Sequence, residues 1–254
     1  MNSLTSNNPL PLQALGLPEG LRVLVLAPHP DDFDEIGVTL RFLWENGNPL
    51  FVAVVTSGAS GVEDTFCSPP TVEAKARLRQ QEQRASCRFF GLPWAHLAFL
   101  RLKEDESGHP VQDEASIDRL RRHLLSRRPS LVLLPHGHDT NLGHQRVYAM
   151  FRRVAQEAGY PLAALLNRDP KTVQMRCDVY VGFGDEMAAW KARLLHFHRS
   201  QQQRNLNQRG YGLGERILET NRQSAEACSV PAPYAEVFEL ELFGASELAD
   251  ILLL

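Results

Sequence analysis

The stretch Leu24-Val25-Leu26-Ala27-Pro28-His29-Pro30-Asp31-Asp32 decides the fold and positions its candidate chemistry. Residues 21–27 form a short apolar run, which is typical of a parallel strand that helices cover on both faces. Pro28 and Pro30 flank His29, so the strand ends there and the backbone around the histidine is stiff. In open α/β sheets, ligands bind at the carboxyl ends of the strands. The stretch therefore predicts a buried strand that brings a histidine and two carboxylates to a binding edge.

The two adjacent carboxylates need a cation between them or different roles, because keeping both ionised beside a sheet is costly. His29 and Asp32 offer one nitrogen and one oxygen ligand to a metal such as Zn²⁺. Asp31 would then be free to accept a proton from metal-activated water. The alternative is structural: His29 ends the strand and one aspartate caps the following helix. A third ligand elsewhere would favour the metal site.

A second strand exit offers that ligand. The apolar run Leu131-Val132-Leu133-Leu134 leads into Pro135-His136-Gly137-His138-Asp139-Thr140-Asn141-Leu142-Gly143-His144. Exits of parallel strands open onto one edge, so residues roughly a hundred positions apart can meet there. Three protein ligands and a water make a catalytic site rather than a closed structural one. His136, His138 and Asp139 are candidates for supporting the ligands, or are ordinary loop residues.

Together the two motifs resemble those of the LmbE-like, PIG-L-type family of zinc-dependent N-acetylglucosamine deacetylases. Residues 29–32 match the family's His-Pro-Asp-Asp motif, and His144 matches the metal-binding histidine that ends its second motif. Further similarity lies in Arg79, Glu82, Ala85 and Phe90-Gly91, and then in Lys191, His198, Ser200, Gln201 and Tyr234-Ala235-Glu236. The resemblance implies a Rossmann-like three-layer α/β/α fold with a mostly parallel sheet.

The resemblance also implies an activity. We expect a metal-dependent hydrolase that deacetylates an N-acetylated amino sugar, of the N-acetylglucosamine type, through metal-activated water. His29, Asp32 and His144 would hold Zn²⁺, although Fe²⁺ or Mn²⁺ would accept the same ligands. Asp31 would be the catalytic base. The open alternatives are a hydrolase of another small N-acyl amide and a non-catalytic sugar-binding protein on the same fold.

Three places depart from the family pattern. Phe33 precedes Asp34-Glu35-Ile36-Gly37, which leaves the geometry of this loop open, and residues 102–105 lack a frequent Pro-Asp-Gly turn. Asn141 stands where many members have a histidine; it can donate a hydrogen bond to an oxyanion but cannot shuttle a proton. His198 is therefore a candidate proton donor, and its alternative role is that of a cation at a helix C-terminus.

The remaining chain predicts alternating helices and strands, as in βαβ units with a sheet covered on both faces. The expected helices are 34–45, 71–90, 113–127, 143–158 and 185–199, and the further strands are 50–56, 95–102, 172–183 and 234–242. Residues 1–20 predict an extended lead-in to a single domain over 1–254. The polar run 201–214 predicts a lid or an oligomer-contact loop. The apolar tail 248–254 would pack on the chain itself or seal a subunit interface.

Composition and charge limit the classes of binding partner that we expect. The 254 residues are 43% hydrophobic and carry a formal charge of -3, with interspersed signs, so we expect no nucleic acid partner. The four cysteines form no CxxC pair and are expected to be free thiols, and no apolar run reaches the ~18 residues of a membrane span. We expect a cytoplasmic protein that acts on a small N-acyl amino sugar or glycoconjugate, and the sequence leaves open whether it forms a homo-oligomer.

Overall fold

The computed structural model describes residues 3–252, with side chains from residue 8 on, so the ends of the predicted lead-in and tail lie outside the described residues. Eight strands form one sheet in the order β1-β7-β8-β6-β5-β2-β3-β4. The strands are β1 (Ser3–Pro11), β2 (Val23–Ala27), β3 (Leu50–Val54), β4 (Leu97–Phe99), β5 (Leu131–Pro135), β6 (Leu162–Asn167), β7 (Gln174–Phe183) and β8 (Tyr234–Phe243). Of these, β8 alone is antiparallel to its neighbours, which confirms a mostly parallel sheet.

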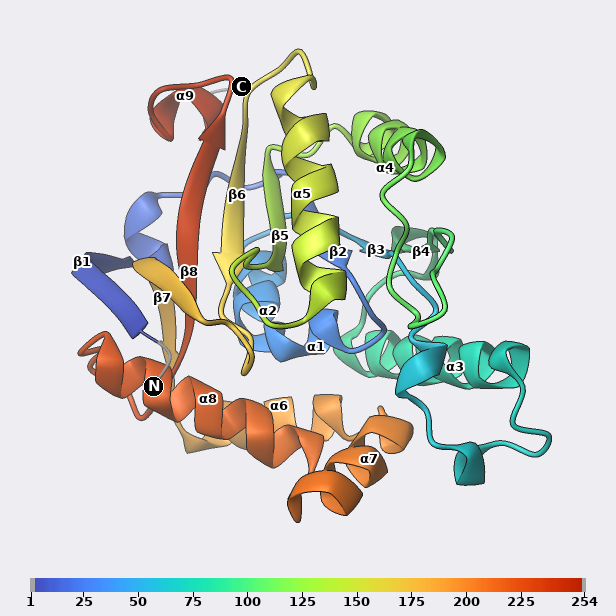
Figure 1. Ribbon diagram of the computed structural model, residues 1–254. Helices are drawn as coiled ribbons and strands as arrows, with labels where there is room; N and C mark the ends of the chain where they lie inside the picture. Colours follow the sequence, from blue (N-terminus) through green and yellow to red (C-terminus); the bar gives the residue numbers. More distant parts are fainter. Residues whose placement is uncertain (1–2, 253–254) are drawn as a thin grey trace.

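The helices lie on both faces of the sheet and at one of its ends (Figure 1). They are α1 (Asp32–Glu35), α2 (Gly37–Glu45), α3 (Val72–Phe90), α4 (Glu114–Arg127), α5 (Leu142–Gln156), α6 (Asp185–Leu195), α7 (Arg199–Arg209), α8 (Leu213–Ala227) and α9 (Ala249–Leu252). In Figure 1 the helices α6, α7 and α8 lie below the sheet, at the end toward which the β6 arrow points.

Alternate residues of β2 face two different hydrophobic cores. Val23 and Val25 pack in the core that includes α2, α3, α6 and α9. Leu24 and Leu26 pack in the core built by α4 and α5. Because both faces of the strand are covered, its sequence is continuously apolar rather than alternating. The three-layer α/β/α architecture is thereby confirmed.

Strand order places the two sequence motifs side by side. β2 pairs in parallel with both β3 and β5, and β5 pairs in parallel with β6. The carboxyl ends of these four neighbouring strands therefore open onto the same edge. His29 follows β2, and His144 lies in the first turn of α5, which follows β5. The expectation that distant residues meet at one edge has its physical basis in this pairing.

The prediction of a polar loop over 201–214 is wrong, because residues 199–209 form α7 and α8 begins at Leu213. α7 has almost no apolar face, so hydrophobic periodicity could not reveal it. Its buried face is polar instead. Gln201 donates to the Gly61 carbonyl at 3.0 Å, and Asn205 donates to the Gln201 carbonyl at 2.9 Å. A hydrogen bond to a neighbouring loop and one within the helix thus take the place that apolar packing usually has.

Other boundaries also differ from the sequence predictions. The helix expected over 34–45 is interrupted at Ile36 and divides into α1 and α2, and the helix expected over 185–199 ends at Leu195. The lead-in contributes the edge strand β1, which pairs with β7. β6 and α8 were not predicted; the run Leu162–Leu166 is composed of good helix formers, and only pairing between β5 and β8 makes it a strand.

The apolar tail packs on the chain itself. Ile251 of α9 is buried in the same core as Leu12, with Leu248 and Leu252 packed against that core. Within residues 3–252, no helix has both the length and the hydropathy that crossing a membrane requires.

Candidate active site and metal centre

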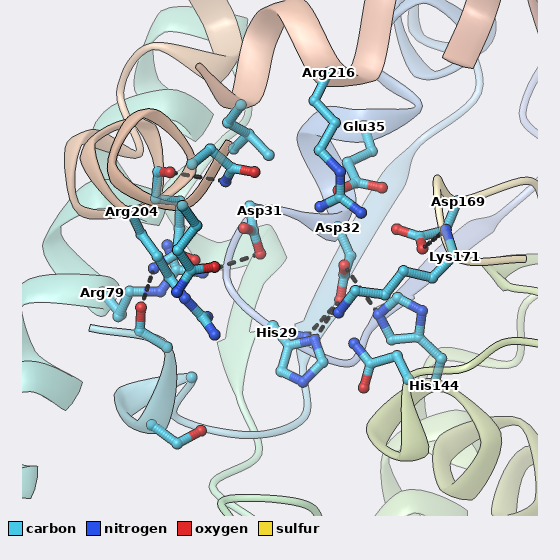
Figure 2. A pocket seen from close by; sticks show the side chains of 18 of the residues that line it. His29, Asp31, Asp32, Glu35, Arg79, His144, Asp169, Lys171, Arg204 and Arg216 are labelled. Atoms are coloured by element: carbon cyan, nitrogen blue, oxygen red, sulfur yellow. Dashed lines mark hydrogen bonds and ion pairs between the residues drawn. The ribbon is translucent and has the colours of Figure 1, made fainter. Parts of the chain in front are cut away.

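A cavity of about 330 Å³ lies at the carboxyl ends of β2, β3, β5 and β6 (Figure 2). Loops after all four strands reach it, and α7 and α8 supply its opposite wall. The predicted residues at the cavity are His29, Asp31, Asp32, Asn141 and His144. The position matches the edge at which parallel sheets bind ligands.

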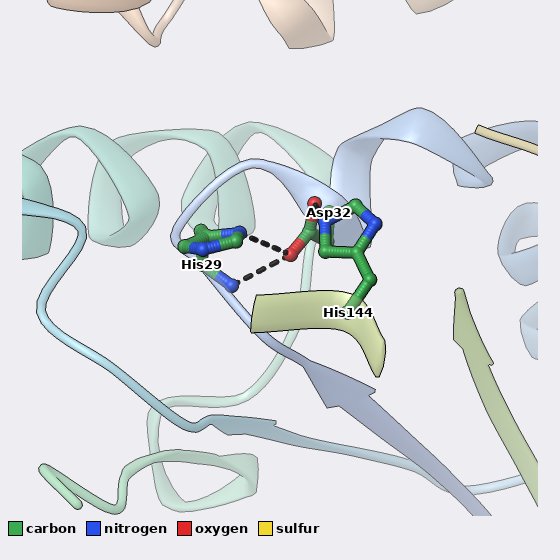
Figure 3. A group of neighbouring side chains, drawn as sticks. All are labelled: His29, Asp32 and His144. Atoms are coloured by element: carbon green, nitrogen blue, oxygen red, sulfur yellow. Dashed lines mark hydrogen bonds and ion pairs between the residues drawn. The ribbon is translucent and has the colours of Figure 1, made fainter. Parts of the chain in front are cut away.

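His29, Asp32 and His144 converge within this cavity (Figure 3). One ligand atom of each residue lies within 4.8 Å of the others. His29 Nδ1 is 3.3 Å from Asp32 Oδ2, and His144 Nε2 is 3.5 Å from Asp32 Oδ1. His144 Nε2 is buried and has no hydrogen-bond partner among residues 3–252. Two imidazole nitrogens, one of them this unpartnered Nε2, and a carboxylate fit a borderline divalent metal such as Zn²⁺.

Electrostatics at the cluster favour positive charge. Burial opposes ionisation of Asp32, but the attraction of the His144 and His29 rings lowers the pKa of this carboxyl. Burial likewise opposes charge on His144, yet Asp32 and Asp139 raise its pKa well above its usual value. Because surrounding carboxylates stabilise a cation at this point, the cluster has the field of a cation-binding site.

Asp139 orients the His144 ring through Nδ1, the ring nitrogen that does not face Asp32. Its Oδ2 lies 3.2 Å from His144 Nδ1, and its Oδ1 accepts a hydrogen bond of 2.6 Å from the Asn141 amide. A carboxylate on one ring nitrogen fixes the other nitrogen toward a ligand, as is usual for metal-binding histidines. Of the other two candidates in this loop, His136 faces Glu239 at 3.3 Å and His138 is exposed.

Asp31 lies beside His29, Asp32 and His144 but is held by other contacts. Its Oδ1 is 2.9 Å from Arg79, and its backbone N–H donates to Gln83 Oε1 at 3.1 Å. Burial raises the pKa of Asp31, although Arg79 opposes this rise. Neither Asp31 nor Asp32 is seen to cap α1: Asp31 stands at the cap position without a capping hydrogen bond, and Asp32 Oδ2 accepts from the His29 amide at 2.6 Å. The helix-cap alternative therefore does not describe them.

One face of α3 is polar and buried, and it supports the Asp31 loop. Its four residues are spaced three or four apart, which places them on one side of the helix: Arg79, Glu82, Gln83 and Ser86. Gln83 and Ser86 both donate to Asp34 Oδ2, at 3.0 and 3.2 Å. Ser200 donates to Glu82 through its backbone and its hydroxyl, at 2.7 Å each. The face thereby joins the loop after β2 to the start of α7.

His198 belongs to this buried network and does not line the cavity. It is fully buried, and its Nε2 lies 2.6 Å from Asp34 Oδ2. His198 is therefore not among the residues that line the cavity with Asp31 and Asn141.

Asn141 lines the cavity and also caps a helix. Its Oδ1 accepts a hydrogen bond of 2.9 Å from the Gly143 amide, which makes it the N-cap of α5. The oxygen is thus committed to the helix, and the amide Nδ2 is the end that can donate to a ligand. Gly143 allows His29 its position, since a Cβ at residue 143 would lie 2.9 Å from His29 Nε2.

Sequence reasoning missed several charged residues of the cavity. They are Glu35, Asp169, Lys171, Arg204, Arg209 and Arg216. Asp169 and Lys171 follow β6, so recognising the apolar run 162–166 as a strand would have placed them at a third exit. The arginines lie on α7 and α8. The sequence did not predict these helices, because the residues of this region are mostly polar.

Comparison with known proteins decides the family. The model of the PIG-L family, described as GlcNAc-PI de-N-acetylase, matches residues 24–155, more than half of the 254 residues. The chain belongs to the PIG-L family. The matched region contains both motifs and the polar face of α3, so the LmbE-like resemblance is confirmed. No curated protein matched the chain.

Solved structures share the fold of this PIG-L protein. N,N'-diacetylchitobiose deacetylase from Pyrococcus horikoshii aligns with a TM-score of 0.70 at 18% identity, over 87% of this chain and 83% of that one. The zinc-inhibited form of teicoplanin deacetylase Orf2 gives 0.66 at 17%, over 89% and 100%. GalB, the 4-carboxy-2-hydroxymuconate hydratase from Pseudomonas putida KT2440, gives 0.66 at 18%, over 89% and 98%. At such identities the likeness shows the fold alone, which carries more than one reaction.

Proposed function

We propose that this PIG-L protein is a metal-dependent N-deacetylase that hydrolyses the acetamide of an N-acetylated amino sugar. The observation that carries the proposal is the convergence of His29, Asp32 and His144 in a cavity, with Asp31 beside them. Family membership supports it, and two of the three structural neighbours described above are deacetylases.

The metal would be held by His29, Asp32 and His144. A divalent cation bound there would supply Lewis-acid polarisation of the amide carbonyl and of a water molecule. Zn²⁺ is our first choice from the mixed donor set, with Fe²⁺ and Mn²⁺ next. Because one neighbour has a zinc-inhibited form, metal should be added in a titration that begins below one equivalent.

Asp31 is proposed as the base and later the acid. Its carboxylate accepts a proton from the attacking water and delivers it to the leaving amine, a role that needs a carboxylate near the ligands but not among them. Burial, which raises its pKa, brings the group closer to the range in which proton transfer in both directions is efficient. Arg79 and Gln83 hold the residue in place.

Asn141 is proposed as an oxyanion donor through its amide Nδ2, because its Oδ1 is already bound by the α5 N-terminus. His198 remains our sequence-based candidate for a proton donor. Its contact with Asp34 and its burial support a positioning role for it instead.

The two rival functions predict different results for metal binding and amide hydrolysis. A hydrolase of another small N-acyl amide would bind metal and release acid from non-sugar amides. A non-catalytic sugar-binding protein would bind metal and ligand without turnover. GalB shows that the fold also carries a hydratase, so the reaction must be tested directly.

The test combines metal analysis with acetate release. Protein purified without added metal is analysed for its elements, then assayed on a panel of N-acetylated sugars and simple amides. We expect about one divalent metal per chain, lost in His144→Ala and retained in Asp31→Asn, with acetate release absent from both variants. His138→Ala is the matched control, because this exposed histidine of the same loop should leave both properties unchanged.

Absence of metal after reconstitution would refute the proposal. Metal binding without hydrolysis of any amide in the panel would leave the sugar-binding alternative.

A further inference from the structure

Charges of both signs line the cavity. The side formed by the strand ends and α1 carries Asp31, Asp32 and Glu35, and Figure 2 shows Arg79 and Lys171 among these carboxylates. The opposite side is formed by α7 and α8 and carries three arginines, which we call the basic wall: Arg204, Arg209 and Arg216. In Figure 2 the side chains of Arg204 and Arg216 extend from these helices into the cavity.

The basic wall has no carboxylate partner in the part of the chain that the structure describes. No Asp or Glu oxygen of residues 8–252 forms an ion pair with any of the three guanidinium groups. Arg222, which is also on α8 but does not line the cavity, lies 2.7 Å from Glu219. The three arginines of the basic wall thus bring positive charge to the cavity without an ion-pair partner.

The carboxylates across the cavity do not neutralise the wall. Asp31 is paired with Arg79, and Asp32 is engaged by the two histidines. Glu35 and Asp169, the other two carboxylates at the cavity, form no ion pair with Arg204, Arg209 or Arg216. An anion entering from solvent would thus meet unpaired guanidinium groups.

Arg204 is the most constrained member of the wall. It is half-buried and lies against the loop after β3, since a Cβ on Gly61 would be 3.0 Å from one of its terminal nitrogens. Burial lowers its pKa, and repulsion from Arg209 and Arg79 adds to this effect. Holding like charges together at the edge of a cavity costs free energy, and a bound anion would offset that cost.

We propose that the substrate of this site carries an anionic group, a phosphate or a carboxylate, which Arg204 and Arg216 bind while the acetamide lies at the ligand cluster. The proposal rests on the deacetylase function proposed above and names its substrate class. Guanidinium groups suit both anions, because their planar N–H donors match two oxygens at once.

The test uses three acetamido sugars with the metal-loaded protein: N-acetylglucosamine 1-phosphate, a carboxymethyl glycoside of N-acetylglucosamine, and its neutral methyl glycoside. We expect kcat/KM for at least one anionic sugar to exceed that of the neutral one by roughly 10- to 100-fold, as charged hydrogen bonds provide. The anionic sugar with the higher kcat/KM shows whether the site prefers a phosphate or a carboxylate. The ratio should fall to about one in the double variant Arg204→Gln and Arg216→Gln. Arg222→Gln is the matched control on α8 and should keep the ratio.

A binding measurement tests this proposal independently of the deacetylase function. Glucosamine 1-phosphate and glucosamine are titrated calorimetrically into the same proteins. Tighter binding of the phosphate, lost in the double variant, would support the basic wall even if no sugar is deacetylated. Equal binding and equal kcat/KM for anionic and neutral sugars, or a preference that survives the double variant, would overturn it.

Discussion

At the residue scale, Gly143 controls where His29 can stand. A methyl group at this position would lie 2.9 Å from His29 Nε2 and 3.1 Å from its Cε1, closer than side chains tolerate. Gly143→Ala should therefore displace the imidazole and weaken metal binding by roughly 10- to 100-fold, the range seen when ligands lose their support. Because the position lies within α5, alanine should also favour the helix by about 1 kcal/mol.

This opposite effect on stability and metal binding makes Gly143→Ala informative. Metal affinity is measured by competition with a chelator, and stability by thermal unfolding without metal. Gly184→Ala is the matched control, because a Cβ there meets nothing within 4 Å. If Gly143→Ala bound metal as tightly as the parent, His29 would not be a ligand in the proposed arrangement.

The backbone conformation of Asp31 could not be predicted from the sequence around it. Its φ of 137° lies in a region that residues other than glycine rarely adopt. Such a conformation costs of order 1–3 kcal/mol and persists only where its surroundings enforce it. Here the Gln83 side chain accepts the Asp31 N–H, and Arg79 holds the carboxylate. The His-Pro-Asp-Asp motif predicts the chemistry of this residue, whereas the strain depends on α3, some fifty positions later.

At the scale of the element, α3 presents a polar face where a core helix usually presents an apolar one. The face and His198 together contact one carboxylate oxygen, Oδ2, of Asp34, which is fully buried. His198→Gln should therefore lower the free energy of unfolding by about 1–3 kcal/mol, because a hydrogen bond to a buried carboxylate is weakened. The pH profile of kcat should keep its shape, since the proton transfers are assigned to Asp31.

Denaturant unfolding and pH-rate profiles check this expectation. Loss of one limb of the profile, together with rescue of activity by added imidazole, would instead identify His198 as the proton donor.

The N-terminus of α2 is anchored by a second buried network. Glu236 of β8 accepts hydrogen bonds from the Val38 and Thr39 amides at 3.1 and 2.7 Å, and from Lys191 of α6 at 2.7 Å. Burial lowers the pKa of Lys191, although Glu236 opposes this shift. Removing one partner would leave an uncompensated buried charge, so Lys191→Met should cost about 3–5 kcal/mol.

Chemical denaturation tests this anchor. The double variant Lys191→Met with Glu236→Gln should recover part of the loss, because neither charge then remains buried. The exposed pair Arg153 and Glu114 provides the control, and Arg153→Met should change stability by less than about 1 kcal/mol. Equal effects at the two pairs would mean that Lys191 is not what anchors α2.

At the scale of the whole molecule, the sequence was informative where burial is apolar and local. Continuous apolar runs identified β2, β3 and β5, and the residues after β2 and β5 gave His29, Asp32 and His144, the candidate ligands that the fold brings together. It was uninformative where tertiary contacts overrode local preference, as at β6, or where a helix buries polar groups, as at α7. Both kinds of element contribute to the cavity, so its basic wall and Asp169 were missed with them.

Removing the metal should lower the stability of the whole fold, because the candidate ligands join β2 to α5 across neighbouring strands. A metal that binds only the folded chain stabilises it by about 2.7 kcal/mol when its free concentration is 100 times Kd. For a chain of 254 residues this corresponds to a rise of roughly 5–10 °C in Tm. Calorimetry with and without a chelator should show this shift in the parent and in Asp31→Asn, but not in His144→Ala. A shift of equal size in His144→Ala would place the metal outside this cluster and remove the central support for the proposed mechanism.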